Sequence, residues 1–144
     1  YLTLKPTKGE ILNICVPDLK IEKIIHSKFL FVPLGNNIYS VGATYNWESN
    51  NDITTKNAKQ KITSVLDSIL SLDYSIIEHR AGIRPSTLDR RPLVGAHPEY
   101  KNMYILNGLG TRGVLMSPYL SSNLFHTIYH NKPLDKEADI NRFQ

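Results

Sequence analysis

Residues 28–45 read K-F-L-F-V-P-L-G-N-N-I-Y-S-V-G-A-T-Y, and this stretch decides the fold class. Two runs rich in aromatic and β-branched residues, Lys28–Pro33 and Asn37–Tyr45, flank the turn residues Gly35-Asn36-Asn37. Glycine and asparagine tolerate the positive φ angles of hairpin turns. The connection is too short for a crossover helix, so the two runs are predicted to be antiparallel strands.

The residues on either side of this hairpin extend the same pattern. Glu10–Val16 and Ile21–Ile25 read as further strands before it. After a polar loop, Thr54 or Thr55 can supply the N-cap of a helix. The apolar positions that follow recur at helical spacing: Ala58, Ile62, Val65, Leu66, Ile69 and Leu70. We expect this helix to cover one face of the sheet.

The C-terminal half changes pattern. Tyr74–Ile83 reads as a strand that runs into Arg84-Pro85, and Met103–Asn107 reads as another. Gly108–Gly113 then opens a second helix, with Met116, Leu120, Leu124 and Ile128 on one stripe. The whole chain is therefore predicted to be α+β: a mainly antiparallel sheet with a covering helix, followed by a strand–glycine loop–helix unit.

Composition excludes several classes of protein. The 144 residues are 41% hydrophobic and 21% charged, which excludes intrinsic disorder. No apolar run approaches the roughly 20 residues of a membrane-spanning helix, and no signal peptide is recognisable, so we expect a cytoplasmic protein. The lone Cys15 excludes a disulfide framework, and the His126/His130 pair lacks a third ligand, so no metal site is predicted. The net charge of +4 permits a nucleic-acid partner without arguing for one.

The glycine loop has two interpretations. Gly108–Gly113 matches G-x-G-x-x-G between a strand and a helix, as in a dinucleotide-binding turn. No second strand with a terminal acidic residue follows, so a complete Rossmann unit is not predicted. A helix N-terminus with small residues and Arg112 still favours an electron-rich group, whether phosphate, carboxylate or reduced heterocycle. The alternative is a tight turn whose glycines serve only packing.

Several segments together resemble one family. They are Pro6–Glu10, Val41–Tyr45, Ala81–Asp89, Arg91–Gly95, Gly108–Gly113 and Ser117-Pro118. In order and spacing they are similar to the FAD-dependent amino-acid oxidases, which include glycine oxidase, D-amino-acid oxidase and sarcosine oxidase. The nearest pattern is that of glycine-oxidase-like proteins and of the oxidase half of the bifunctional tRNA methylaminomethyl-thiouridine biosynthesis enzyme.

The resemblance implies a division of the chain. Residues 1–100 would form a substrate-binding-type antiparallel α+β domain. Residues 101–144 would be the returning strand and helix that complete an FAD-binding domain whose N-terminal region is missing. Tyr1 would then mark the start of a piece, and this piece alone is expected to be inactive.

The resemblance also implies roles for individual residues. Arg84 matches the arginine that holds the substrate carboxylate, and Tyr45 is placed to face the substrate. Gly108, Leu109, Gly110, Thr111, Arg112 and Gly113 match the loop beside the flavin, so the implied cofactor is FAD. Asp89 is expected to order the loop after Arg84, and no residue is assigned an acid–base role.

Two departures bear on the substrate. Glycine oxidases carry a second arginine at the position of Thr111, and some carry a substrate-contacting tyrosine at the position of Leu30.

Three functions follow from these expectations. The first is an FAD-dependent oxidase of amino acids or N-substituted glycines, acting on a small carboxylate substrate. The second is a tRNA-modifying oxidase that removes a carboxymethyl group from a modified uridine. The third is a non-catalytic domain that binds an anion or a partner.

Overall fold

The computed structural model describes residues 2–143 and contains two compact units. Lys8–Ile83 forms one, here called the sheet unit. The described residues of Tyr1–Thr7 and Arg84–Gln144 form the other, here called the hairpin unit. The sequence led us to expect a division after residue 100. The units divide at residue 84 because the strands on either side of residue 100 pair with each other.

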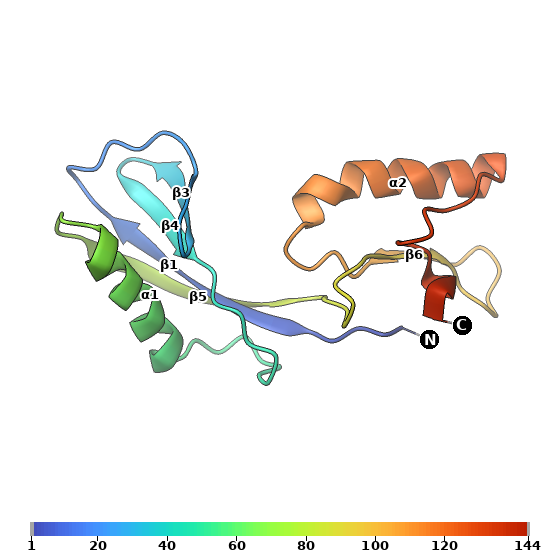
Figure 1. Cartoon of the computed structure of the whole chain (residues 1–144), viewed down its shortest axis with the longest axis horizontal. Helices are drawn as coiled ribbons and strands as arrows, with labels where there is room; N and C mark the ends of the chain where they lie inside the picture. The colour runs from blue at the N-terminus through green and yellow to red at the C-terminus, as the bar shows by residue number, and fades with distance from the viewer. Residues whose placement is uncertain (1, 144) are drawn as a thin grey trace. The chain divides into compact units, whose positions relative to one another are not determined.

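Five strands form the sheet, in the order β2-β3-β4-β1-β5. They are β1 (Thr7–Cys15), β2 (Ile25–His26), β3 (Leu30–Gly35), β4 (Ile38–Gly42) and β5 (Ser75–Arg84). Figure 1 labels β3, β4, β1 and β5 of this sheet. Strand β4 pairs antiparallel with both β1 and β3. The β3–β4 turn is the predicted one, with φ of 90° at Gly35 and 51° and 59° at Asn36 and Asn37. The antiparallel character predicted from this hairpin is confirmed.

One helix covers the sheet. It is α1 (Lys56–Ile69), and it begins as predicted with Thr55 as N-cap. Ile62 and Leu66 are fully buried and form one cluster with Leu12 and Ile14 of β1. The alternating apolar positions of the strands and the helical stripe therefore meet in a single core.

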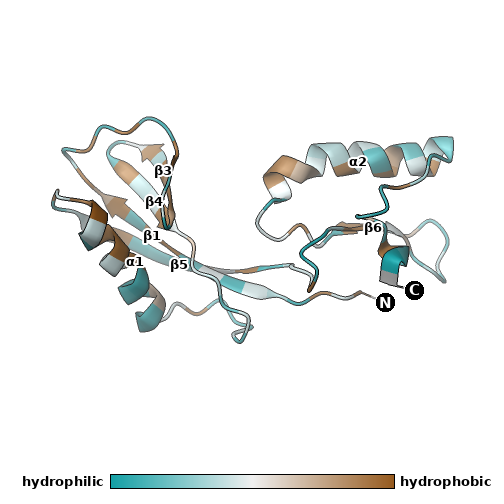
Figure 2. Cartoon of the chain, viewed as in Figure 1, coloured by the Kyte–Doolittle hydropathy of each residue, from teal (hydrophilic) through white to brown (hydrophobic). Residues whose placement is uncertain are grey.

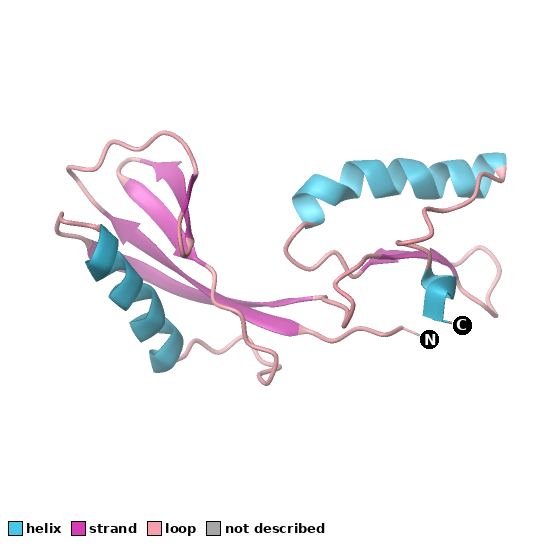
Figure 3. Cartoon of the chain, in the orientation of Figure 1, coloured by secondary structure: helices cyan, strands magenta, loops and turns pink. Residues whose placement is uncertain are grey.

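The hairpin unit combines a pair of strands with helices (Figure 3). It contains β6 (Leu93–Ala96), β7 (Tyr104–Asn107), α2 (Gly113–His130) and the short 3-10 helix η1 (Ile140–Phe143). Its core joins Val94, Leu120 and Ala138, with Met116 and Leu124 packed against them as the helical stripe predicts. Apolar and polar residues are mixed along α2 (Figure 2). Several large apolar residues of this helix are exposed: Val114, Leu115, Tyr119, Phe125 and Tyr129.

One predicted strand is largely wrong. Only Ile25 of the Ile21–Ile25 stretch lies in a strand. The hydroxyl of Tyr39 takes the place of strand pairing there: it donates to Leu19 O and accepts from Ile21 N–H. Leu19 and Ile21 thus pack on the core without joining the sheet.

Candidate functional site

Strand β5 ends at Arg84, and the residues that follow belong to a firmly held segment of the hairpin unit. Arg84 is half-buried, and the two residues after Pro85 are buried, with Ser86 2% and Thr87 0% exposed. The hydroxyls of Ser86 and Thr7 are 2.8 Å apart and hydrogen-bonded, and Thr87 Oγ1 donates to Arg91 O at 2.7 Å. The backbone that follows Arg84 is therefore fixed by buried hydrogen bonds.

The glycine loop lies directly against this segment. Gly110 N–H donates to Pro85 O at 3.3 Å. Gly108 has φ of 70°, and a Cβ there would lie 3.0 Å from Thr87 Cγ2 and 3.1 Å from Leu93 N. For Gly108 the structure therefore shows a packing role. The fold thus places the glycine loop next to the stretch after Arg84, and the sequence had singled out both.

The start of α2 is open. Its N-cap residue, Arg112, makes no side-chain capping hydrogen bond. The Arg112 guanidinium instead donates to Arg90 O at 2.8 Å, which keeps a positive charge beside the helix N-terminus. Val114 and Leu115 in the first turn are 96% and 79% exposed. A Cβ on Gly113 would meet nothing nearer than Leu109 Cβ at 3.7 Å, so packing within the chain does not require a glycine there.

These features fit the cofactor that the sequence implied. A flavin needs donors at the edge of its ring where negative charge develops on reduction, and apolar surface along the ring. Uncapped N–H groups and the positive dipole end of α2 would supply the first, and Val114 and Leu115 the second. The side-chain-free Gly113 leaves the backbone open to close approach.

Asp89 orders the loop after Arg84, as expected. It accepts hydrogen bonds from Arg91 N–H and from the Arg142 guanidinium, whose Nε lies 3.0 Å from Asp89 Oδ2. Burial raises the pKa of Asp89, but the hydrogen bonds from the Arg142 guanidinium and from Arg91 N–H outweigh it, together with the charge of Arg142. The pKa of Asp89 consequently lies below its ordinary value.

Tyr45 lies in the sheet unit, whereas Arg84 lies in the hairpin unit. Tyr45 follows β4 and lines a pocket of about 380 Å³ between the residues after β4 and the first turns of α1. Its ring meets that of Trp47 edge to face, with the centroids 5.3 Å apart. Glu10, Thr44 and Lys61 are among the other lining residues. A cavity of this size accommodates a small organic ligand.

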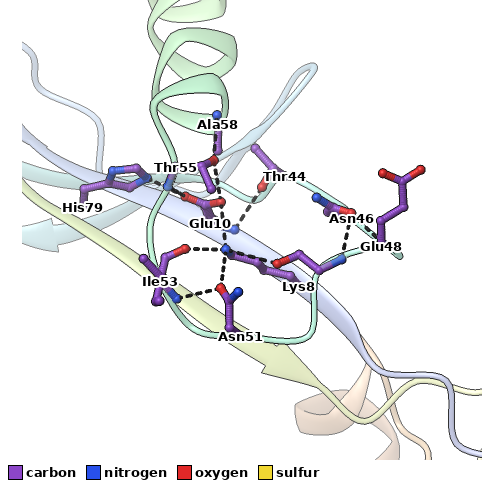
Figure 4. A network of polar contacts seen from close by, with 11 residues as sticks. Lys8, Glu10, Thr44, Asn46, Glu48, Asn51, Ile53, Thr55, Ala58 and His79 are labelled. Carbon is purple, nitrogen blue, oxygen red and sulfur yellow. Dashed lines mark hydrogen bonds and ion pairs between the residues drawn. The ribbon is translucent and has the colours of Figure 1, made fainter.

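Beside this pocket lies a buried polar network that the sequence reasoning missed (Figure 4). Lys8 and Glu10 are 1% and 3% exposed, and Lys8 Nζ lies 3.6 Å from Glu10 Oε1. The Glu10 carboxylate accepts from Thr55 N–H at 2.7 Å and from Thr55 Oγ1 at 2.9 Å. One signal was available: Lys8 and Glu10 alternate in step with the core residues Leu12 and Ile14, so all four face the same side of β1.

His79 of β5 joins this network. Its Nε2 lies 2.9 Å from Glu10 Oε2, at ion-pair distance but without the alignment of a hydrogen bond. His79 is 16% exposed, whereas Glu78 and Arg80 are 50% and 63% exposed. His79 therefore faces away from its two neighbours, as the alternation of side chains along a strand requires.

Within residues 2–143, no group of three or more histidine, cysteine, aspartate or glutamate side chains is arranged to hold a metal ion. The helices of the same region include none that is both long enough and apolar enough to cross a membrane.

Comparison with known proteins decides the family. The sequence profile of the DAO family, described as FAD dependent oxidoreductase, matches residues 1–124. The chain belongs to this family. It is 27% identical over 137 residues to glycine oxidase of Bacillus subtilis (strain 168), covering 92% of this chain and 36% of that protein. It is 25% identical over 137 residues to the tRNA 5-methylaminomethyl-2-thiouridine biosynthesis bifunctional protein MnmC of Marinobacter nauticus, covering 85% of this chain and 22% of that protein.

Solved structures show the same fold. Iminodiacetate oxidase from Chelativorans sp. BNC1 superposes with a TM-score of 0.80 at 24% identity, covering 94% of this chain and 40% of that one. Glycine oxidase from Geobacillus kaustophilus gives 0.77 at 23%, covering 94% and 38%. The chain thus has the fold of part of a DAO-family oxidoreductase and spans about two fifths of these proteins or less. The α+β class, the family resemblance and the assignment to FAD-dependent oxidoreductases are confirmed.

Proposed function

We propose that the protein to which this chain belongs is an FAD-dependent oxidase of amino acids or N-substituted glycines. One observation carries the proposal: the glycine loop at the open start of α2 is hydrogen-bonded to the segment that follows Arg84. The backbone at Pro85 would then link Arg84, as the carboxylate-binding residue, to the helix start that binds the flavin. Bound FAD would supply the acceptor for the hydride that leaves the carbon of the C–N bond.

Arg84 binds the substrate carboxylate in this proposal. A guanidinium donates two parallel hydrogen bonds to a carboxylate and stays charged at any working pH. Because Ser86 and Thr87 fix the backbone beyond it, Arg84 would orient the substrate and not merely attract it. Tyr45 would contact the substrate from the pocket of the sheet unit.

The residues Gly108–Gly113 hold the cofactor in this proposal. The first-turn N–H groups of α2 and the charge of Arg112 favour an electron-rich ring edge. The remaining contacts would come from an N-terminal FAD-binding region of the longer protein. The proposal also retains a cytoplasmic location.

The two alternatives gain no support. The chain is 27% identical to a glycine oxidase and 25% identical to the tRNA-modifying protein, so the likeness to the latter does not discriminate between the two activities. A non-catalytic anion-binding role would use the same helix start and the same Arg112 charge as the flavin site, so no feature of the chain favours it over flavin binding. The amino-acid oxidase is therefore the function retained.

The carboxylate clamp is tested in the full-length protein with FAD bound. Arg84→Ala removes two charge-assisted hydrogen bonds, so KM for carboxylate substrates should rise about 100-fold, while Arg84→Lys recovers only part of the loss. Arg80→Ala is the matched control, because Arg80 is an exposed arginine of the same strand. A normal KM in Arg84→Ala would exclude the clamp role.

A further inference from the structure

The segment from Thr44 to Thr55, here called the pocket segment, is held at both ends by two residues of β1. At its start, Lys8 and Asn46 exchange backbone hydrogen bonds of 2.8 and 2.9 Å. Glu10 N–H donates to Thr44 Oγ1, and Thr44 N–H donates to Glu10 O, both at 3.0 Å. The backbone of β1 therefore fixes where the segment leaves the sheet.

The far end is held by the side chains of the same two residues (Figure 4). Lys8 Nζ donates to Asn51 Oδ1 at 3.1 Å and to Ile53 O. Glu10 accepts from both Thr55 N–H and Thr55 Oγ1, and that hydroxyl also accepts from Ala58 N–H. Glu10 thereby orients the N-cap of α1 as well as the end of the segment.

Burying this charged pair has a cost. Lys8 and Glu10 are deeply buried, so both lose their hydration on folding. The attraction between two such charges offsets little more than this free-energy cost, and a protein with apolar residues of similar shape in their place is often as stable. Such pairs are best explained where they fix one conformation among several. The conformation that this pair fixes is that of the pocket segment.

The pocket segment carries Tyr45 and Trp47, whose edge-to-face pair forms one wall of the 380 Å³ pocket. Tyr45 and Trp47 are 42% and 36% exposed, and neither belongs to the hydrophobic core cluster of the sheet unit. We propose that Lys8 and Glu10 are positioning residues that set the place of Tyr45 and Trp47 and so determine which substrates the pocket accepts. This inference rests on the proposed function, since it assigns the pocket to the substrate.

The first test follows the segment directly in the chain of 144 residues. Trp47 is its only tryptophan, so tryptophan fluorescence reports the pocket segment alone. Lys8→Met/Glu10→Gln removes both charges together and should fold, because neither charge is left unpaired. We expect Trp47 to become more accessible to acrylamide quenching. Glu78→Gln/Arg80→Met is the matched control, because it neutralises an exposed pair on β5 and should leave quenching unchanged.

The second test uses the full-length protein with FAD bound. The readout is the ratio of kcat/KM for glycine to that for an amine with a larger N-substituent, such as N-ethylglycine. We expect the double variant to change this ratio about 10-fold, whereas a purely structural loss would lower both values equally. A folded double variant with unchanged quenching and an unchanged ratio would overturn the inference.

Two further outcomes are decisive. If the double variant does not fold, Asn51→Ala replaces it, because Asn51 is exposed and its loss removes a Lys8 acceptor from the segment. Unchanged quenching and an unchanged ratio in Asn51→Ala would equally overturn the inference. If the unmodified protein oxidises no amino acid, the proposed function fails and with it the assignment of the pocket to substrate, even where quenching shows that Lys8 and Glu10 hold the segment.

Discussion

Helix α1 begins with a filled cap, whereas α2 begins without one. At the start of α1, Thr55 Oγ1 accepts from Ala58 N–H while donating to the buried Glu10. At the start of α2, Arg112 gives no side-chain cap, and the first turn exposes Val114 and Leu115. The chain satisfies one helix start from within and leaves the other open to a partner group. In the proposed function, the capped start of α1 serves the fold and the uncapped start of α2 binds the flavin.

Breaking the filled cap should have the largest effect on stability. Glu10→Ala leaves the Lys8 ammonium buried without its carboxylate partner and removes the oxygens that accept from Thr55 N–H and Thr55 Oγ1. We expect the free energy of unfolding to fall by about 3–5 kcal/mol, measured by urea denaturation followed through Trp47. Glu78→Ala on exposed β5 is the control, with a change within about 0.5 kcal/mol. A loss below about 1 kcal/mol in Glu10→Ala would contradict a buried, paired Glu10.

Substitutions of two glycines in the loop should affect different properties, one the stability of the fold and the other the binding of FAD. Gly108→Ala places a Cβ 3.0 Å from Thr87 Cγ2 at φ of 70°, so it should destabilise the protein by about 1–3 kcal/mol. Gly113→Ala meets only ordinary contacts, so stability should change by less than about 0.5 kcal/mol while FAD affinity of the full-length protein falls. Thermal unfolding and flavin titration measure the two effects. Equal stability losses in both variants would remove the distinction.

A smaller effect is expected in acid. Because the pKa of Asp89 in the folded protein lies below its ordinary value of 3.8, its contribution to stability is present above that value. The contribution is lost as pH falls from there through the lower folded pKa. Asp89→Asn should therefore flatten the acid limb of the stability–pH profile and leave its alkaline limb alone. Parallel profiles for Asp89→Asn and the unmodified chain would show that Arg142 does not stabilise the carboxylate.

Local chemistry made much of the fold predictable. Gly35-Asn36-Asn37 specified the hairpin, and Thr55 with the apolar stripe after it specified α1. The strand predicted at Ile21–Ile25 was largely wrong because Ile21 N–H bonds to the Tyr39 hydroxyl and not to a neighbouring strand, and a local pattern does not reveal this partner.

The site was predictable to a lesser degree. Lys8 and Glu10 were missed because charged residues in a strand read as exposed, and only pairing across distant segments makes their burial tolerable. The sequence singled out Arg84 and the glycine loop separately. Their closeness through Pro85 arises from tertiary folding, which local patterns do not encode. The roles of Arg84, Tyr45 and Gly108–Gly113 toward substrate and cofactor stay predictions.

The most direct measurement is anaerobic reduction of the flavin in the full-length protein. Adding glycine or an N-substituted glycine should bleach the yellow absorbance of bound FAD. Arg84→Ala should bind FAD normally but remain yellow at the same substrate concentration, because the carboxylate is no longer held. Flavin that stays oxidised in the unmodified protein with all such substrates, or bleaching that is equal in Arg84→Ala, would contradict the account.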